Sequence, residues 1–85
     1  MIVHDAANHR FEAELPEGTG FLDYRIQGDR IYLVHVETPP AARGQGHAAA
    51  ITKAALEWAV ESKLKIVPIC PFTISYLRRH PEYEH

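Results

Sequence analysis

Alternating apolar and polar residues predict a set of short β-strands in the first half of the chain. Phe11, Ala13 and Leu15 alternate with charged residues, which is the period-two pattern of a strand with one buried face and one wet face. A later run is apolar on both faces except for His35, which favours a central strand. The predicted strands are residues 2–4, 10–15, 21–27 and 31–36.

The pattern changes to a helical period in the second half of the chain. From His47 to about Ser62, small and apolar residues recur every three or four positions, while charged residues occupy another face. This spacing predicts an amphipathic helix. Residues 64–70 predict one more strand, and Thr73 to His80 predict a short helix that Pro81 closes.

Turn residues separate these segments. Residues 5–9 connect the first two strands, residues 16–20 form a turn by composition, and Gly28-Asp29 predicts a tight hairpin connection. The order is therefore β-β-β-β-α-β-α, in which the single βαβ crossover makes the fourth and fifth strands parallel. We expect an α+β fold with a mixed sheet, forming one domain over residues 1–85.

Composition limits the classes of function. The net charge of -2 gives no general attraction to nucleic acid or to an acidic membrane surface. No apolar run approaches the roughly 20 residues that span a bilayer, and the N-terminus lacks a secretory pattern. The single cysteine, Cys70, cannot form an internal disulfide, so we expect a cytoplasmic protein. The six histidines lack the spacing of metal ligands, and we expect no metal site.

The stretch from Ala41 to Ala48, between a strand and a helix, carries the most informative chemistry. A helix N-terminus presents unpaired N–H groups and the positive end of the helix dipole. Gly44 and Gly46 allow the backbone to turn sharply and approach an anion, and Arg43 can pair with phosphate oxygens. The loop thus predicts a pyrophosphate site. The alternative is an ordinary turn before a helix.

Three phosphate-binding patterns can be compared with this loop. The P-loop is excluded because no Gly-Lys-Ser/Thr follows. Gly44-x-Gly46-x-x-Ala49 fits the dinucleotide fingerprint, but that fold needs more βαβ units than this chain can hold. The acetyltransferase pattern Arg/Gln-x-x-Gly-x-Gly/Ala is matched at both glycines. Ala41 replaces its Arg/Gln, and Arg43 is a candidate for the missing charge.

Further motifs extend the likeness beyond the loop. His35-Val-Glu-Thr-Pro39 precedes it, and a strand ending in Pro68-Ile-Cys-Pro-Phe72 and the run Tyr76-Leu-Arg-Arg-His-Pro-Glu-Tyr83 follow it. Together these resemble the small YjdJ-type branch of the Gcn5-related N-acetyltransferases. The likeness covers nearly the whole chain and is strongest from His35 to Tyr83.

The resemblance implies a minimal acetyltransferase fold that binds acetyl-CoA or CoA. Two parallel strands, residues 31–36 and 64–69, would splay apart and hold the pantetheine arm between them, and the glycine loop would hold the pyrophosphate. The implied cofactor-binding residues are Val34, Val36, Arg43, Gly44, Gln45, Gly46, His47, Ala48, Cys70, Pro71, Phe72, Tyr76 and Arg79.

The resemblance also implies acetyl transfer to an amine, with the acetyl group near Cys70. Cys70 could form a thioester, or the amine could attack acetyl-CoA directly. We favour direct attack, because a free cysteine is usually a small buried apolar residue. His35 is the candidate base and Glu37 the alternative, and Tyr76 is the candidate proton donor to the leaving thiolate. A structural histidine and a packing tyrosine are the alternatives for His35 and Tyr76.

The acceptor is left open by the sequence. Larger relatives carry extra helices between their early strands, and the strands predicted here leave no room for them. We therefore expect an open acceptor site, or one built by another subunit, in a monomer or weak homodimer. The missing helices around the acceptor site and the departure from the motif at Ala41 make a non-catalytic CoA-binding module the alternative function. The acidic balance argues against a nucleic-acid-binding domain.

Overall fold

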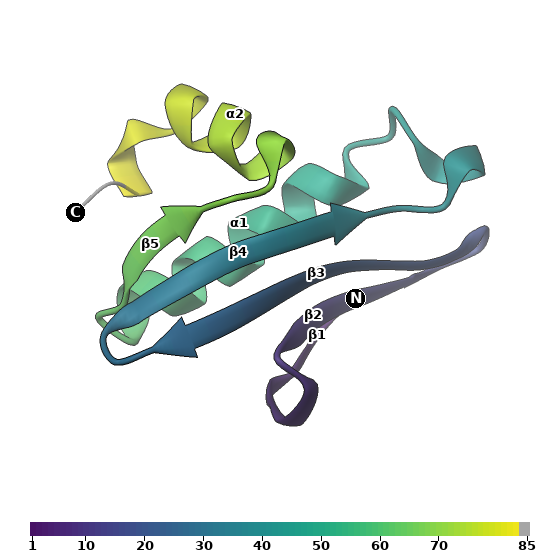
Figure 1. The fold of residues 1–85 in the computed structure, drawn as a ribbon. Helices are drawn as coiled ribbons and strands as arrows, with labels where there is room; N and C mark the ends of the chain where they lie inside the picture. Colours follow the sequence, from purple (N-terminus) through teal and green to yellow (C-terminus); the bar gives the residue numbers. More distant parts are fainter. Residues whose placement is uncertain (84–85) are drawn as a thin grey trace.

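The computed structural model describes residues 1–83, which form five strands and two α-helices in the order predicted (Figure 1). The strands are β1 (Ile2–Asp5), β2 (Arg10–Leu15), β3 (Gly18–Gln27), β4 (Arg30–Glu37) and β5 (Lys65–Pro68). The helices are α1 (His47–Glu61) and α2 (Pro71–Arg79), with short 3₁₀ turns at Ala6–Asn8, Pro40–Ala42 and Pro81–Tyr83.

The strands lie in the sheet in their sequence order, β1-β2-β3-β4-β5. The first four form antiparallel pairs, and β5 runs parallel to β4 because α1 carries the chain back between them. This arrangement confirms the predicted mixed sheet and α+β fold.

The parallel ladder covers only the first half of β4. It begins at Arg30 and ends where Leu33 faces Pro68, whereas β4 itself continues to Glu37. The carbonyl of Leu33 accepts hydrogen bonds from the N–H groups of Ile69 and Cys70, at 3.0 and 3.1 Å. The chain then leaves the sheet to begin α2, so the two parallel strands splay apart after Leu33.

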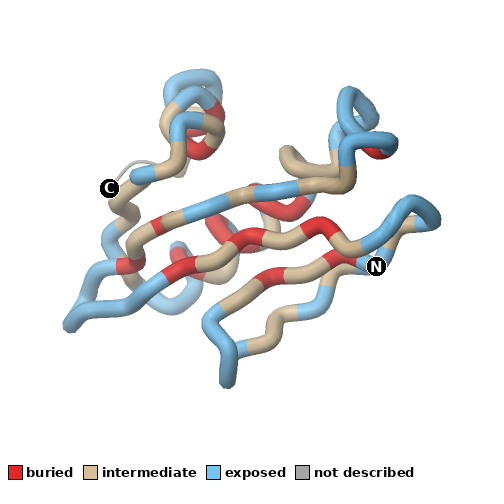
Figure 2. Tube along the Cα trace, turned by 45° about the vertical axis from the view of Figure 1, so that its right-hand side comes forward, coloured by how far each residue is buried: buried red, intermediate tan, exposed pale blue. Residues whose placement is uncertain are grey.

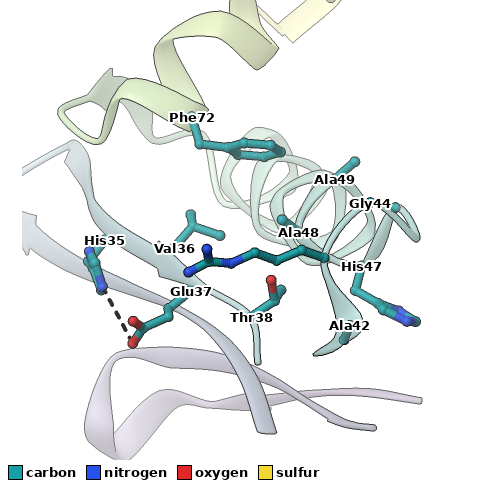
Figure 3. Close-up of a pocket in the computed structure, with 12 residues that line it drawn as sticks. His35, Val36, Glu37, Thr38, Ala42, Gly44, His47, Ala48, Ala49 and Phe72 are labelled. Carbon is teal, nitrogen blue, oxygen red and sulfur yellow. Dashed lines mark ion pairs between the residues drawn. The ribbon is translucent and has the colours of Figure 1, made fainter. Parts of the chain in front are cut away.

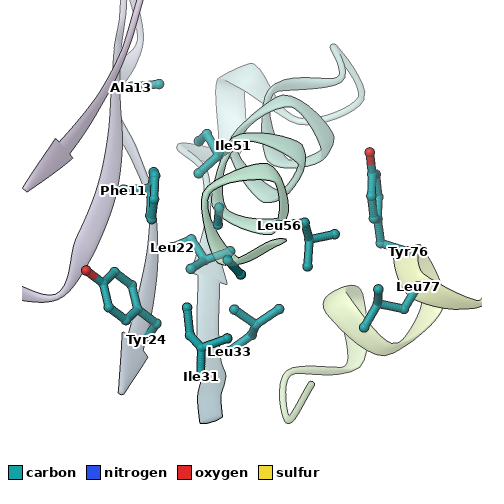
Figure 4. Close-up of a cluster of buried hydrophobic side chains, with 12 residues drawn as sticks. Phe11, Ala13, Leu22, Tyr24, Ile31, Leu33, Ile51, Leu56, Tyr76 and Leu77 are labelled. Carbon is teal, nitrogen blue, oxygen red and sulfur yellow. The ribbon is translucent and has the colours of Figure 1, made fainter. Parts of the chain in front are cut away.

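The core lies between one face of the sheet and α1, with α2 beside them (Figures 2 and 4). Leu22, Ile31 and Leu33 from the sheet meet Ile51 and Leu56 from α1, and all five are fully buried. Leu56 extends toward α2, which adds buried aromatic and aliphatic side chains (Figure 4). The apolar face predicted for the helix and the apolar face predicted for the strands therefore pack against each other in this core.

Several boundaries differ from the sequence prediction. Residues 16–20 were expected as a turn, but β3 begins at Gly18 and pairs with β2 from there. The fifth strand was expected to extend to Cys70, but it ends at Pro68. The second helix begins at Pro71 rather than Thr73, because proline fits the first helical position, where no N–H partner is needed.

The fourth strand was expected to be a central one, apolar on both faces except for His35, and β4 does lie between β3 and β5. The side chain of His35 is 53% exposed, so His35 is not a buried histidine. The sheet face opposite α1 carries this side chain, and residues 1–83 place no helix over that face. An uncovered face tolerates polar side chains beside apolar ones, as a half-wet sheet does.

Candidate functional site

A groove of about 530 Å³ lies where β4 extends past β5, beside the first turn of α1 (Figure 3). Its walls come from the outer end of β4, the loop that follows, the start of α1 and the start of α2. The lining residues are His35, Val36, Glu37, Thr38, Ala42, Arg43, Gly44, Gly46, His47, Ala48, Ala49 and Phe72.

The glycine loop forms one end of the groove. Gly44 and Gly46 have φ angles of 82° and 83°, in the left-handed region that glycine adopts at least cost. Gly46 is the N-cap of α1 and leaves the helix without a side-chain cap. The first intrahelical bond runs from the N–H of Ala50 to the carbonyl of Gly46, so the preceding N–H groups lie free at the end of the helix.

The space in front of these glycines is open. A Cβ added at Gly44 or Gly46 would meet no atom of residues 1–83 within 4 Å. Packing among the described residues therefore requires neither glycine, and the backbone conformation is what favours glycine at both positions. The exposed backbone, the helix dipole and the neighbouring Arg43 together form a surface suited to an anion such as a pyrophosphate.

The outer half of β4 forms the floor of the groove. Asp23 pairs with His35 and Tyr24 with Leu33, so Val34 is the extra residue of a β-bulge. Beyond Leu33, no strand within residues 1–83 pairs with the β5-facing edge of β4. Backbone groups on this edge are available to a ligand that carries amides, as at any free strand edge.

His35 and Glu37 lie side by side on this strand. The His35 Nε2 and Glu37 Oε2 atoms are 3.8 Å apart, and both side chains are about half exposed, at 53% and 55% (Figure 3). His35 also lies 5.9 Å from the ring of Phe21, measured between centroids. Both residues line the groove, and their side chains lie on the sheet face opposite α1, whereas Val36 between them faces the helix.

Six of the predicted site residues lie outside the lining of the groove. Val34 points to two recesses on the opposite face of the sheet, and Cys70 and Pro71 immediately precede the lining residue Phe72. Gln45 and Arg79 are exposed, and the Gln45 Oε1 atom lies 3.2 Å from His47 Nε2. Tyr76 is the sixth. The binding or catalytic roles predicted for these residues stay predictions.

Tyr76 is packed into the core rather than exposed in the groove. It is 8% exposed, stacks on His80 at 4.2 Å between centroids, and lies 6.4 Å from the ring of Phe72. Burial raises the pKa of its hydroxyl, and the nearby carboxylates of Glu82 and Glu57 raise it further. The phenol therefore keeps its proton at neutral pH.

Three lining residues, Thr38, Ala42 and Ala49, were not predicted. Ala42 is 1% exposed and closes the groove from within the 3₁₀ turn before Arg43. Ala49 continues the run of small residues after the glycine loop, a signal that the sequence did contain. Among residues 1–83, no group of three potential metal-binding side chains gathers in one place, and no helix is long and apolar enough to cross a membrane.

Comparison with known proteins yields consistent similarities. The sequence model of a family described as GCN5-related N-acetyl-transferase matches residues 10–85. Protein NATD1 of Gallus gallus is 35% identical over 84 residues, which cover 95% of this chain and 76% of that protein. Protein NATD1 of Mus musculus is 35% identical over 83 residues, covering 94% and 76%.

A solved structure shares the fold. The solution structure of a GCN5-like protein from Staphylococcus aureus superposes with a TM-score of 0.71, covering 98% of this chain and 82% of that one. The two sequences are 24% identical, so this likeness concerns the fold.

Proposed function

The chain belongs to the GCN5-related N-acetyltransferase family, and we propose that it transfers the acetyl group of acetyl-CoA to an amine. One observation supports this proposal above all. The uncapped N-terminus of α1 opens into a groove that continues along the unpaired edge of β4. A phosphate site joined to a free strand edge fits a ligand with a pyrophosphate at one end and an amide-containing arm.

The residues of the groove divide into two parts in this proposal. The N–H groups at the start of α1, with Arg43, bind the pyrophosphate of CoA. The edge of β4 beyond Leu33 pairs with the amides of the pantetheine arm, and Phe72 packs against it from α2. These contacts would hold the thioester near His35 and Glu37.

The reaction we propose is direct attack by the amine. A bond forms between the amine nitrogen and the thioester carbonyl carbon, the C–S bond breaks, and the amine loses a proton. His35 or Glu37 takes that proton, since both line the groove and lie within reach of each other. The position of Cys70 outside the lining supports this route over a thioester on the protein.

Tyr76 is less well placed as a proton donor. Its raised pKa keeps the hydroxyl protonated, as a donor to the leaving thiolate requires. However, its burial in the core and its stacking on His80 favour a packing role. The proposed mechanism therefore assigns no proton transfer to Tyr76, and the thiolate can be protonated by water.

A thermal-shift titration with acetyl-CoA, CoA and NAD tests the binding part of the proposal. A ligand at about 100 times its dissociation constant adds roughly 2.7 kcal/mol to the free energy of unfolding. For a domain of this size the melting temperature should rise by roughly 10 °C or more. We expect this rise with acetyl-CoA and CoA and none with NAD.

Paired variants separate the glycine loop from a general effect on folding. Gly46→Glu places a negative, bulky side chain in front of the proposed pyrophosphate site and should abolish the shift. Gly28→Glu makes the same change at a left-handed glycine in the β3–β4 turn, where a Cβ also meets no atom within 4 Å in the described part of the chain. That control should keep the full shift.

The absence of a shift at millimolar CoA would overturn the proposal. If CoA does bind, acetyl transfer is measured as the release of free CoA thiol from acetyl-CoA in the presence of amines. Binding of CoA without release of thiol by any amine would favour a CoA-binding module instead of an enzyme.

A further inference from the structure

A second recess lies on the face of the sheet that α1 leaves uncovered. It has a volume of about 300 Å³ and is lined by Arg25, Gln27, Tyr32, Val34 and Ile69. Arg25 and Tyr32 are direct partners across β3 and β4, which places their side chains on the same face. Their neighbours Tyr24, Ile31 and Leu33 are buried against the core, so the recess opens on the opposite side of the sheet.

The recess adjoins the groove at the point where the strands splay. Val34, the bulge residue in the recess, directly precedes His35 in the groove. On the other side of the gap, Ile69 lines the recess and Cys70 follows it, and both bond through their N–H groups to Leu33. A small molecule seated in the recess can therefore present one end to the groove.

The body of the recess is apolar. Ile69 is 51% exposed, an uncommon position for a large aliphatic side chain, and it faces the same hollow as Tyr32 and Val34. Burying these surfaces under an apolar ligand is favourable in proportion to the area removed from water. No side chain of residues 1–83 fills the space between these lining residues.

The charge at the edge of the recess comes from Arg25. Arg10, another arginine of this face, forms a close ion pair with Asp23, with 2.6 Å between Nε and Oδ1. Arg25, in contrast, forms no ion pair with any residue from 1 to 83 and is exposed. An unpaired guanidinium beside an apolar hollow suits a carboxylate, which it can bind with two parallel hydrogen bonds.

We propose that the amine acceptor carries an apolar body and a carboxylate, as a free apolar amino acid does, and that it binds in this recess. The carboxylate pairs with Arg25, and the apolar part covers Tyr32, Val34 and Ile69. The amine points past Val34 toward the groove, where its nitrogen bonds to the acetyl carbon as CoA leaves and its proton passes to His35 or Glu37. This inference rests on the proposed function and specifies its substrate class.

The test uses matched acceptors with the whole protein and acetyl-CoA. L-leucine and L-phenylalanine are compared with leucinamide and phenylalaninamide, which keep the amine and the apolar body but lack the carboxylate. Spermidine and a lysine-containing peptide represent cationic acceptors. We expect kcat/KM for the amino acids to exceed that for their amides by roughly tenfold to a hundredfold, the usual range for losing a charged hydrogen-bonding partner.

Variants assign the preference to Arg25. Arg25→Gln removes the charge from an exposed residue and should bring the ratio between leucine and leucinamide close to one, mainly through KM. Lys53→Gln removes one positive charge from the exposed side of α1, far from the recess, and should leave the ratio unchanged. Both variants should keep the thermal shift with CoA, which shows that the fold and the groove are intact.

The failure of this inference can be told apart from failure of the proposed function. If CoA binds but the amides react as well as the amino acids, or spermidine reacts best, the recess does not select a carboxylate and the inference is wrong. An unchanged preference in Arg25→Gln would also overturn it. If CoA itself does not bind, the proposed function falls first.

Discussion

At the scale of single residues, the backbone conformation of the loop favours glycine at Gly44 and Gly46, and the proposed pyrophosphate site would favour it as well. Gly44 and Gly46 adopt left-handed φ angles with open space in front of them. A side chain at either position would strain the backbone and also occupy the space from which an anion reaches the helix N-terminus. Glycine thus satisfies a local constraint and leaves the approach to α1 clear.

Cys70 provides a residue-scale prediction that distinguishes the two chemical routes. It lies at the N-cap of α2, outside the lining of the groove, and its carbonyl accepts a hydrogen bond from Thr73 Oγ1 at 2.8 Å. We expect Cys70→Ala to keep kcat within about threefold of the unmodified enzyme, because direct attack needs no thiol. The measurement is acetyl-CoA turnover with the best amine found.

Intact-mass analysis supplies the complementary observation for Cys70. After brief incubation with acetyl-CoA and no amine, the unmodified protein should show no added acetyl group. An acetyl adduct that forms rapidly and is absent in Cys70→Ala, together with a large loss of turnover, would establish the covalent route instead.

At the scale of elements, β4 combines two different environments. Its first half pairs with β3 and β5 and buries Ile31 and Leu33, whereas its second half pairs with β3 alone. The bulge at Val34 separates the two halves. The first half anchors the strand in the core, and the second half offers a backbone edge to the groove and carries His35 and Glu37 on the face opposite α1.

Gly20 gives an element-scale prediction about how closely β3 packs on α1. A Cβ at Gly20 would lie 3.2 Å from Ile51 Cδ1 and 3.4 Å from Thr38 Cγ2. Gly20→Val should therefore overpack this contact and destabilise the protein by about 1–3 kcal/mol. Urea unfolding, followed by tryptophan fluorescence, measures the change.

The neighbouring Thr19→Val is the control for Gly20→Val. It replaces one β-branched side chain with another of similar shape, one position along the same strand, and removes an exposed hydrogen bond to Glu14. Its effect should stay within about 0.5 kcal/mol. Equal destabilisation by both variants would show that the strand, and not its contact with α1, limits stability.

At the scale of the whole molecule, His4 connects the edge strand to the rest of the fold. Its ring stacks on Phe11 at 4.0 Å and meets Trp58 of α1 edge-on at 4.5 Å, both measured between centroids. Its Nε2 lies 2.6 Å from the hydroxyl of Tyr24, which can donate to the unprotonated ring. Protonation of His4 would remove this acceptor and place a charge in a half-buried aromatic cluster.

The position of His4 predicts a pH dependence of global stability. Burial lowers the pKa of His4 below its ordinary value of 6.5, against a smaller opposing effect of Asp5. The unfolded chain therefore binds a proton at higher pH than the folded chain does. The free energy of unfolding should be highest above pH 6.5, the ordinary pKa of histidine. It should fall as the pH decreases from there toward the lower pKa of His4 in the folded protein.

His4→Phe should flatten this dependence while keeping a ring against Phe11. The loss of the Tyr24 hydrogen bond should cost about 1 kcal/mol near neutral pH. Melting temperatures between about pH 7.5 and about pH 5 measure both effects. His9→Asn, which changes an exposed histidine in the turn after β1, should keep the slope of the unmodified protein, and an equal slope in His4→Phe would contradict the argument.

Local patterns predicted the order of elements and the glycine loop because both depend on short-range chemistry. The period-two alternation around Phe11 and the helical spacing from His47 are properties of neighbouring residues, and so is the helix start after Gly46. The boundaries at Gly18 and Pro68 were less accurate, because cross-strand pairing decides where a strand begins and ends.

The candidate site was predicted in part for the same reason. The residues around Gly44 are contiguous, so the sequence places them together. The exposure of His35, the burial of Tyr76 and the position of Cys70 outside the groove depend on where distant elements pack. The recess beside Arg25 had no sequence signal, because three separate segments form it.

By itself, then, the amino-acid sequence determined the succession of strands and helices, the conformation of the loop before α1 and the family, since these are local or linear properties of the chain. Only the tertiary structure decided that β4 extends beyond the end of its pairing with β5, which leaves one edge of β4 unpaired. It also decided that this unpaired edge meets the N-terminus of α1, and which residues line the resulting groove. The physical reason is that burial and unpaired backbone edges arise between elements, from contacts that no single segment contains.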